Sequence, residues 1–222
     1  MCGRFTLTVG LEQLAERFSF HTTDLSWKPR YNIAPSQSIL TVLNADGENR
    51  VGYLRWGLIP SWAKDASIGN RMINARAETV AEKPSFRRAL QKRRCLILAD
   101  GFYEWRKEGK KKIPVLVSLK SRIPFGFAGL WESWRDPNGE TIHSCTIITT
   151  TPNALMATIH NRMPVILPAE KESLWLDSTV VDPQQLVSFL KPYPDAAMTV
   201  HDVSNIVNSP RNDVPECIAP LL

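Results

Sequence analysis

The sequence has few of the features that mark secreted, membrane-spanning or metal-binding proteins. Its four cysteines, Cys2, Cys95, Cys145 and Cys217, form no C-x-x-C pair and no Cys/His cluster at zinc-ligand spacing. No apolar run approaches the roughly 18 residues of a membrane span. Charged residues interrupt the N-terminal region, which excludes a signal peptide. We therefore expect free thiols, no metal, no cofactor and no membrane association, in a cytoplasmic protein.

No internal repeat, low-complexity stretch or linker divides the 222 residues, so we expect one domain over residues 1–222. Apolar spacing predicts a helix over 11–18. Further helices are predicted at 83–91, 152–159, 169–176 and 183–190. Strands are predicted at 39–43, 51–58, 95–99, 102–106, 114–119, 125–134, 144–150, 165–167 and 198–203, with long loops at 24–37 and 59–79. Strands mix with helices without βαβ alternation, so we predict an α+β fold with an antiparallel sheet curled into a barrel-like core.

The net charge of +5 is compatible with a phosphate-bearing partner but does not require one. Two basic runs, at 87–94 and 106–112, supply much of the excess, and such runs are typical of solvated helix and turn faces. Any phosphate-binding surface must then come from arginines near the chemistry. Cys95 and Cys145 lie in strand-like apolar runs and are predicted to be core residues, because free cysteine packs as a small hydrophobe.

Cys2 is distinguished by its position. Removal of Met1 is favoured before a small residue and would leave an α-amine and a thiol on one residue, both with usable nucleophilic fractions near neutral pH. Such an aminothiol can attack an amide carbonyl. It can also condense with an aldehyde, first as an imine and then as a five-membered thiazolidine ring, whose closure is intramolecular and therefore favoured. From Met-Cys-Gly alone, a chance small residue after the initiator is equally open.

Six motifs then occur in a recognisable order. They are MCGRF at 1–5, YNIAPSQ at 31–37, RWGLIPSW at 55–62, INARAET at 73–79, ADGFYEW at 99–105 and IHNRMPVIL at 159–167. Together they resemble the SOS response-associated peptidase family, the abasic-site processing proteins, over nearly the whole chain. The resemblance implies one α+β domain with a positively charged groove, in which Cys2 becomes N-terminal and forms a thiazolidine crosslink with an abasic site in single-stranded DNA.

The resemblance also assigns residues. It implies catalytic roles for Cys2, Asn74, Glu104 and His160. It implies DNA-contacting positions at Gly3, Arg4, Pro35, Arg76, Thr149 and Arg162. The peptide cleavage it implies is the protein's own removal of Met1, and AP-lyase activity through the imine is a further candidate. It leads us to expect a monomer that acts on damaged single-stranded DNA at the nucleoid or replication fork, with the replication machinery as a candidate partner.

The chemistry gives these residue types a reason of their own. Aromatic neighbours in FYEW would desolvate Glu104, which raises a carboxyl pKa and suits it to acid/base work. His160 can exchange protons near neutral pH, and Asn74 can orient an amine or a sugar oxygen without adding charge. Each has a plainer alternative: a strand glutamate paired with a lysine on the neighbouring strand, a structural histidine, and a turn asparagine. Nothing distinguishes His21, His143 and His201 from structural histidines.

Arg4, Arg76 and Arg162 each follow a predicted catalytic residue by two positions. In an extended strand, residues i and i+2 face the same side, so each arginine could lie beside its catalytic neighbour and bind a phosphate. The alternative is three surface arginines.

Trp62 is a candidate for stacking on an exposed base, whereas Trp56 could equally pack in the core. Two other functions stay open: a cysteine peptidase acting on other proteins, and an N-terminal nucleophile amidohydrolase, since class II glutamine amidotransferases also begin Met-Cys-Gly.

Overall fold

The computed structural model describes residues 2–21 and 25–221. The predicted loss of Met1, and Asp24 at the start of the first predicted loop, lie outside these residues. The strands are β1 (Phe5–Leu7), β2 (Arg30–Ile33), β3 (Ser38–Ala45), β4 (Glu48–Trp56), β5 (Asn74–Arg76), β6 (Arg94–Ala99), β7 (Gly101–Glu108), β8 (Lys111–Leu119), β9 (Phe125–Arg135), β10 (Thr141–Thr150), β11 (Met163–Pro164) and β12 (Met198–Asp202). The α-helices are α1 (Leu11–Phe18), α2 (Arg87–Lys92), α3 (Ala154–Ala157), α4 (Ala169–Leu176) and α5 (Pro183–Ser188). Short 3-10 helices cover Ala66–Arg71, Asp195–Ala197, Asn205–Asn208 and Pro215–Cys217.

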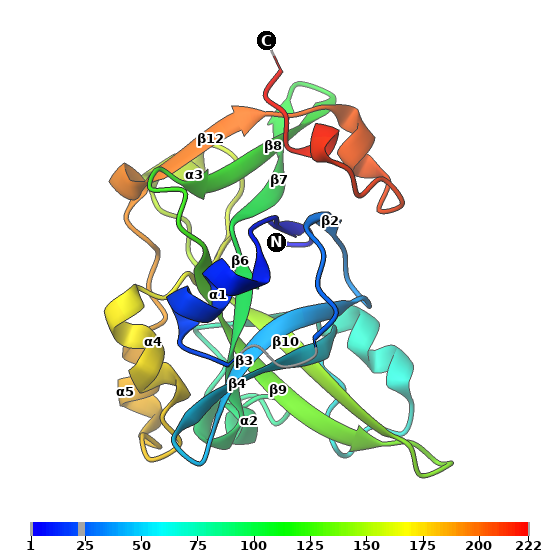
Figure 1. Ribbon diagram of the computed structural model, residues 1–222, viewed down its shortest axis with the longest axis vertical. Helices are drawn as coiled ribbons and strands as arrows, with labels where there is room; N and C mark the ends of the chain where they lie inside the picture. The colour runs from blue at the N-terminus through cyan, green and yellow to red at the C-terminus, as the bar shows by residue number, and fades with distance from the viewer. Residues whose placement is uncertain (1, 22–24, 222) are drawn as a thin grey trace.

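The described strands form two sheets, which Figure 1 shows one above the other. The upper sheet has the order β12-β8-β7-β1-β2. In the lower sheet, β10, β4, β3, β6 and β9 follow one another, and β9 pairs again with β10, so that these five strands close into a barrel. β11 and β5 add to β10 outside the ring. The predicted α+β fold with a barrel-like core is confirmed.

The sheet is not wholly antiparallel, because β10 runs parallel to both β4 and β5. Most of the chain between β4 and β5 lies in the segment predicted as a long loop. It leads into β5, which lies beside β10 and runs parallel to it, as β4 does. Gly57 begins this return with a φ of +126°. A Cβ there would lie 2.6 Å from the Gly69 carbonyl oxygen, so only glycine fits.

Most predicted elements are present with shifted ends. The helices at 11–18 and 169–176 have the predicted bounds. The helix predicted from Lys83 begins at Arg87, because residues 83–86 form a turn in which Arg87 N–H donates to the Lys83 carbonyl. The strand predicted at 165–167 is instead β11, two residues earlier. β1, β2 and β5 were not predicted, since each is three or four residues long and pairs with distant partners.

The hydrophobic core joins the two sheets, and this contact places the N-terminal segment. The ring of Phe5 in β1 meets the rings of Trp56 and Phe127 of the barrel at centroid distances of 5.2 and 5.9 Å. Trp56 is fully buried, so it packs in the core as the alternative above held. Cys95 and Cys145 are buried as predicted, and burial raises the pKa of both thiols. Cys2 therefore lies three residues before Phe5, which holds the N-terminal segment in the core.

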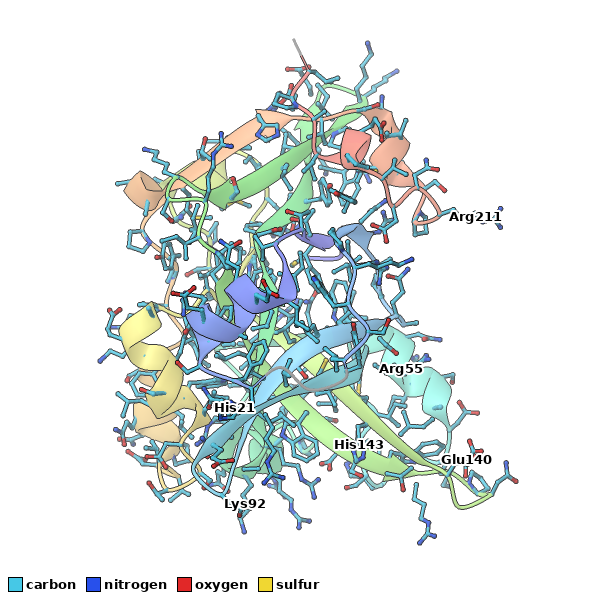
Figure 2. The ribbon with its side chains drawn as sticks, viewed as in Figure 1. His21, Arg55, Lys92, Glu140, His143 and Arg211 are labelled. Atoms are coloured by element: carbon cyan, nitrogen blue, oxygen red, sulfur yellow. The ribbon has the colours of Figure 1, made fainter. Side chains whose placement is uncertain are left out.

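Several side chains lie away from this junction. In Figure 2, His21, His143 and Lys92 lie in the lower part of the molecule, well below the N-terminal segment. His201 contacts the Ile218 carbonyl through Nε2 at 3.1 Å. Among the described residues, no three His, Cys, Asp or Glu side chains are grouped so as to hold a metal ion. Across residues 2–21 and 25–221, none of the helices has the length and apolar character to span a bilayer.

Candidate active site

The N-terminal segment is tied to β7 at the position next to Glu104. The Cys2 side chain is fully buried, and its thiol donates to the Arg4 carbonyl at 3.9 Å, a distance suited to sulfur. The same carbonyl accepts from the Tyr103 N–H at 3.0 Å. Burial raises the pKa of the Cys2 thiol strongly, and the nearby Glu104 charge adds to this. A buried thiol beside a carboxylate stays protonated until a base takes its proton.

Glu104 is a buried carboxyl group, with 3% of the residue exposed. Its direct cross-strand neighbour on β8 is Val115, so the strand register gives no support to the alternative of a cross-strand lysine partner. Burial raises the pKa of the Glu104 carboxyl, while the nearby His160 imidazole acts in the opposite direction. The predicted desolvation of this carboxyl group is therefore confirmed, and the group can hold a proton at a pH where an exposed glutamate cannot.

The end of β10 brings together segments that are far apart in the sequence. On one side β5 pairs with it, placing Asn74 opposite Ile147 and Arg76 opposite Thr149. On the other side β11 pairs with it, placing Pro164 opposite Thr149. Arg162 precedes Pro164 by two residues, so Thr149 lies between the two arginine-bearing segments.

Asn74 carries an amide whose nitrogen and oxygen are both buried. Neither atom has a hydrogen-bond partner among the described residues. A buried amide without partners costs free energy, which a hydrogen bond to a bound reactant or water would recover. Its location at the start of β5, two residues before Arg76, is suited to an amide that orients a polar reactant.

His160 follows α3 and is fixed by its backbone and its ring. Its N–H donates to the Met156 carbonyl at 2.8 Å. The Arg162 N–H donates to His160 Nδ1 at 3.0 Å, and the Arg162 carbonyl oxygen lies 3.3 Å from the same nitrogen. Sequence-local contacts thus hold the imidazole in one orientation.

Two open cavities meet at His160. One, of about 640 Å³, is lined by Arg76, Glu78, Thr79, His160, Asn161 and Arg162. The other, of about 360 Å³, is lined by Glu104, Trp105, Lys107, Lys112 and His160. His160 therefore stands between an arginine-bearing cavity, which we call the arginine flank, and a lysine-bearing cavity, which we call the lysine flank.

The arginine flank is partly neutralised from within the chain. Arg162 makes a two-pronged ion pair with Glu78, with N···O distances of 2.6 and 2.9 Å. It also donates to the Thr149 carbonyl at 2.6 Å. The Arg162 guanidinium lowers the pKa of the Glu78 carboxyl. Arg76 is exposed at the mouth of the same cavity.

Comparison with known proteins agrees with this geometry. The sequence matches the family described as SOS response associated peptidase (SRAP) over residues 1–210. The chain belongs to the SRAP family. Abasic site processing protein YoqW of Bacillus subtilis (strain 168) is 52% identical over 221 residues, which cover 98% of this chain and 99% of that protein. Abasic site processing protein HMCES of Rattus norvegicus is 35% identical over 86% of this chain and 65% of its own length.

A solved crystal structure has the same fold. The crystal structure of a protein from Bacteroides thetaiotaomicron superposes with a TM-score of 0.89 at 30% identity, covering 100% of both chains. The family resemblance drawn from the six motifs is confirmed. The roles that it assigns to individual residues stay predictions.

The predicted arrangement of three arginines is only partly correct in this SRAP chain. Asn74 and Arg76 share a face of β5 as expected. β1, however, begins only at Phe5, and residues 160–162 form an irregular turn, so strand alternation does not align Arg4 or Arg162. What brings Arg162 to Arg76 is the pairing of β10 with both β5 and β11.

Arg4 has strong partners within the chain. Its guanidinium donates to Asn32 Oδ1 and to the Val207 carbonyl, each at 2.7 Å, and to the Asn208 carbonyl at 3.2 Å. The amide nitrogen of buried Asn32 donates in turn to three carbonyls of the C-terminal segment. Arg4 therefore connects the residues around Cys2 to the C-terminal segment.

The remaining predicted DNA contacts are spread around this centre. Thr149 is fully buried beneath Arg162, so an effect on DNA would act through that arginine. Gly3 and Pro35 are half-buried, Pro35 in the turn between β2 and β3. Trp62 is 60% exposed and lines a separate cavity of about 350 Å³ with Lys64 and Arg71.

Sequence reasoning missed six residues that line the two flanks: Glu78, Thr79, Asn161, Trp105, Lys107 and Lys112. Glu78 stands in the motif INARAET, but its ion pair with Arg162 spans 84 positions. Trp105, Lys107 and Lys112 belong to the FYEW motif and to the basic run after it, which was interpreted as a solvated face. The strand predicted at 102–106 ended one residue before Lys107: β7 continues to Glu108, so Lys107 follows Trp105 by two positions in the strand and shares its face.

Proposed function

We propose that this SRAP-family chain processes abasic sites in single-stranded DNA by linking them covalently to Cys2. The observation that carries the proposal is the grouping of a buried thiol, a buried carboxyl of raised pKa and an oriented imidazole between two cationic cavities. The relatives named abasic site processing proteins support it. An abasic nucleotide supplies an aldehyde, and its neighbours supply phosphates for the cations.

The first step is removal of Met1. Hydrolysis of the Met1–Cys2 peptide bond consumes one water and leaves a free α-amine on Cys2. The position of the Cys2 thiol near Glu104 supports a self-cleavage in which the thiol attacks the Met1 carbonyl and water releases the resulting acyl group. The product is an aminothiol whose amine is the stronger nucleophile, because burial keeps the thiol protonated.

The second step joins the protein to the sugar. The amine adds to C1′ of the ring-opened sugar, and loss of one water gives an imine. The thiol then adds to the imine carbon: a C–S bond forms, and the thiol proton passes to nitrogen, closing a thiazolidine. Glu104 donates a proton to the departing hydroxyl and later accepts one, while His160 exchanges protons as the sugar ring opens. Asn74 holds the amine or a sugar oxygen.

The imine also allows strand cleavage. It acidifies the proton on C2′, and its removal by Glu104 or His160 would break the bond between C3′ and its phosphate oxygen. Closure of the thiazolidine ring removes the imine and so competes with this elimination. AP-lyase activity is therefore a minor branch of the same chemistry.

The test is an adduct assay with a single-stranded oligonucleotide that contains one abasic site. Wild type should form an adduct that resists heat and SDS, and Cys2→Ala should form none. Cys95→Ala is the matched control, since it removes a buried thiol from the barrel and should still crosslink. An uncleavable N-terminal extension should abolish the adduct, because it converts the amine to an amide. Wild type without an adduct contradicts the proposal, and Cys2-dependent turnover of an unrelated peptide would support a peptidase instead.

A further inference from the structure

The β7–β8 hairpin carries two cations that nothing in its own fold requires. Lys107 of β7 lies directly opposite Lys112 of β8. Like charges in direct cross-strand register destabilise an antiparallel pair. The next pair toward the turn, Glu108 with Lys111, has opposite charges. Within the described chain, neither Lys107 nor Lys112 has an ion pair or hydrogen bond, and both are exposed.

These two lysines border a cavity that reaches the reaction centre, although alternation along β7 places the Glu104 side chain on the opposite face of the strand from Trp105 and Lys107. They line the cavity of about 360 Å³ together with Glu104 and His160. In Figure 1, β7 rises from the middle of the molecule, beside the N-terminal segment, to the upper end where β8 turns back. The hairpin thus extends outward from the N-terminal segment, and the Lys107–Lys112 pair lies along it.

Trp105 adds an aromatic surface to the same cavity. It precedes Lys107 by two residues, so the two side chains share a face of β7. Its indole N–H donates to Asn208 Oδ1 at 2.7 Å, and the Arg4 guanidinium lies 6.0 Å from its ring centroid. A fixed and partly exposed ring beside lysines is the combination that single-strand binding proteins use to stack bases and track phosphates.

From this geometry we propose that Lys107 and Lys112 bind backbone phosphates on one side of the abasic nucleotide, with Trp105 beneath a neighbouring base. Arg76 and Arg162 line the cavity on the other side of His160 and bind the phosphates there. A single strand whose abasic sugar sits at His160 passes through both flanks. This inference rests on the proposed function, and it assigns part of the basic run at 106–112 to DNA.

The experiment measures reversible binding to a single-stranded oligonucleotide carrying a tetrahydrofuran analogue of the abasic site. This analogue lacks the aldehyde, so binding does not depend on crosslinking. Each phosphate contact in single-stranded DNA contributes about 0.7 to the slope of log K against log salt. The double variant Lys107→Gln, Lys112→Gln should lower the magnitude of that slope by about 1.4. Near physiological salt its affinity should fall by at least about tenfold.

The matched control is the double variant Lys110→Gln, Lys111→Gln. It removes the same charge from the exposed tip of the same hairpin, outside the cavity. It should change the slope by less than half as much. Equal slopes for the two double variants, or a wild-type slope for the first, overturn the proposal. Failure of the proposed function is distinct: wild type would then form no adduct with a true abasic oligonucleotide, whatever the slopes.

Half-strands locate the contact. Two further oligonucleotides carry nucleotides on only the 5′ or only the 3′ side of the analogue. The Lys107/Lys112 double variant should bind one of these oligonucleotides more weakly than wild type does. It should bind the other as tightly as wild type does. An equal loss with both would contradict binding on one side.

Discussion

Two glutamates lie near His160, one on each flank, and their pKa values are displaced in opposite directions. Glu104 on the lysine flank is buried, and burial raises its pKa. Glu78 on the arginine flank is exposed, and its two-pronged contact with Arg162 lowers its pKa. Pairs of carboxyl groups separated in this way commonly divide proton transfer from charge balance. The proposed function accordingly gives proton transfer to Glu104, whereas Glu78 restrains Arg162.

The cations show the same contrast. Arg162 has its guanidinium occupied by Glu78 and by the Thr149 carbonyl. Lys107 and Lys112 have no ion pair among the described residues and lie opposite each other. If DNA binds as proposed, it must displace an internal partner of Arg162 on the arginine flank, whereas it would relieve the repulsion between Lys107 and Lys112 on the lysine flank. Under the proposed function, the lysine flank supplies binding energy, whereas the internal contacts of Arg162 keep the arginine flank ordered without DNA.

The largest expected effect comes from Glu104→Gln. The amide keeps the size of the side chain but cannot transfer a proton, so the rate of adduct formation with an abasic oligonucleotide should fall by at least about 100-fold. The rate measured by gel under single-turnover conditions tests this. Glu78→Gln in the same assay should stay within about fivefold of wild type. If the two variants lose rate equally, the division of roles is wrong.

A smaller effect is expected from Glu78→Gln on DNA binding. Without its carboxylate partner, the Arg162 fork is available to one phosphate, which should steepen the salt slope by up to about 0.7. Affinity for the tetrahydrofuran analogue should rise several-fold at low salt. Glu82→Gln, an exposed neighbour with the same change of charge, is the control. Weaker binding by Glu78→Gln would show that the ion pair orients Arg162 for DNA and does not compete with it.

The smallest effect is on stability, and its sign differs between the two carboxyl groups. The folded-state pKa of Glu104 lies above its ordinary 4.5, so the stability it contributes is present below pH 4.5 and is lost as pH rises through the folded value. Glu104→Gln should therefore melt at a higher temperature than wild type at pH 8, and the gap should close as the pH falls to about 4.

For Glu78 the window is reversed. Its folded-state pKa lies below 4.5, so its contribution is present above pH 4.5 and is lost as pH falls through the lowered value. Glu78→Gln should melt slightly below wild type at pH 8, by an amount that solvent screening keeps small, since the side chain is 45% exposed. Melting curves across pH 4–8 compare both variants. Parallel shifts in the same direction would contradict the opposite pKa displacements.

Part of this site could be predicted because its signals are local. The aromatic neighbours in FYEW indicated a desolvated Glu104, and the apolar spacing at 11–18 indicated α1. The strands predicted at 102–106 and 114–119 correspond to β7 and β8. Each prediction needed only the side chains within one element or across one short turn.

The rest depends on pairings that local patterns do not encode. β5 has three residues and is defined by β10, about 70 positions later. Arg4 was predicted to meet DNA, but its partners Asn32 and Val207 come from β2 and the C-terminal segment. The Lys107–Lys112 pair required the register of the hairpin, which the composition of a basic run does not specify. Long-range register, more than residue type, decided which contacts the sequence could not predict, whereas the DNA contact expected of Arg4 stays a prediction.

Intact mass spectrometry of the purified chain, before and after incubation with an abasic oligonucleotide, tests the central claim most directly. The account predicts a protein lacking Met1, followed by a one-to-one product whose mass is the sum of protein and oligonucleotide less one water. Digestion should place the added mass on Cys2. A protein that retains Met1 and still forms the adduct, or an adduct located on any other residue, would contradict the account.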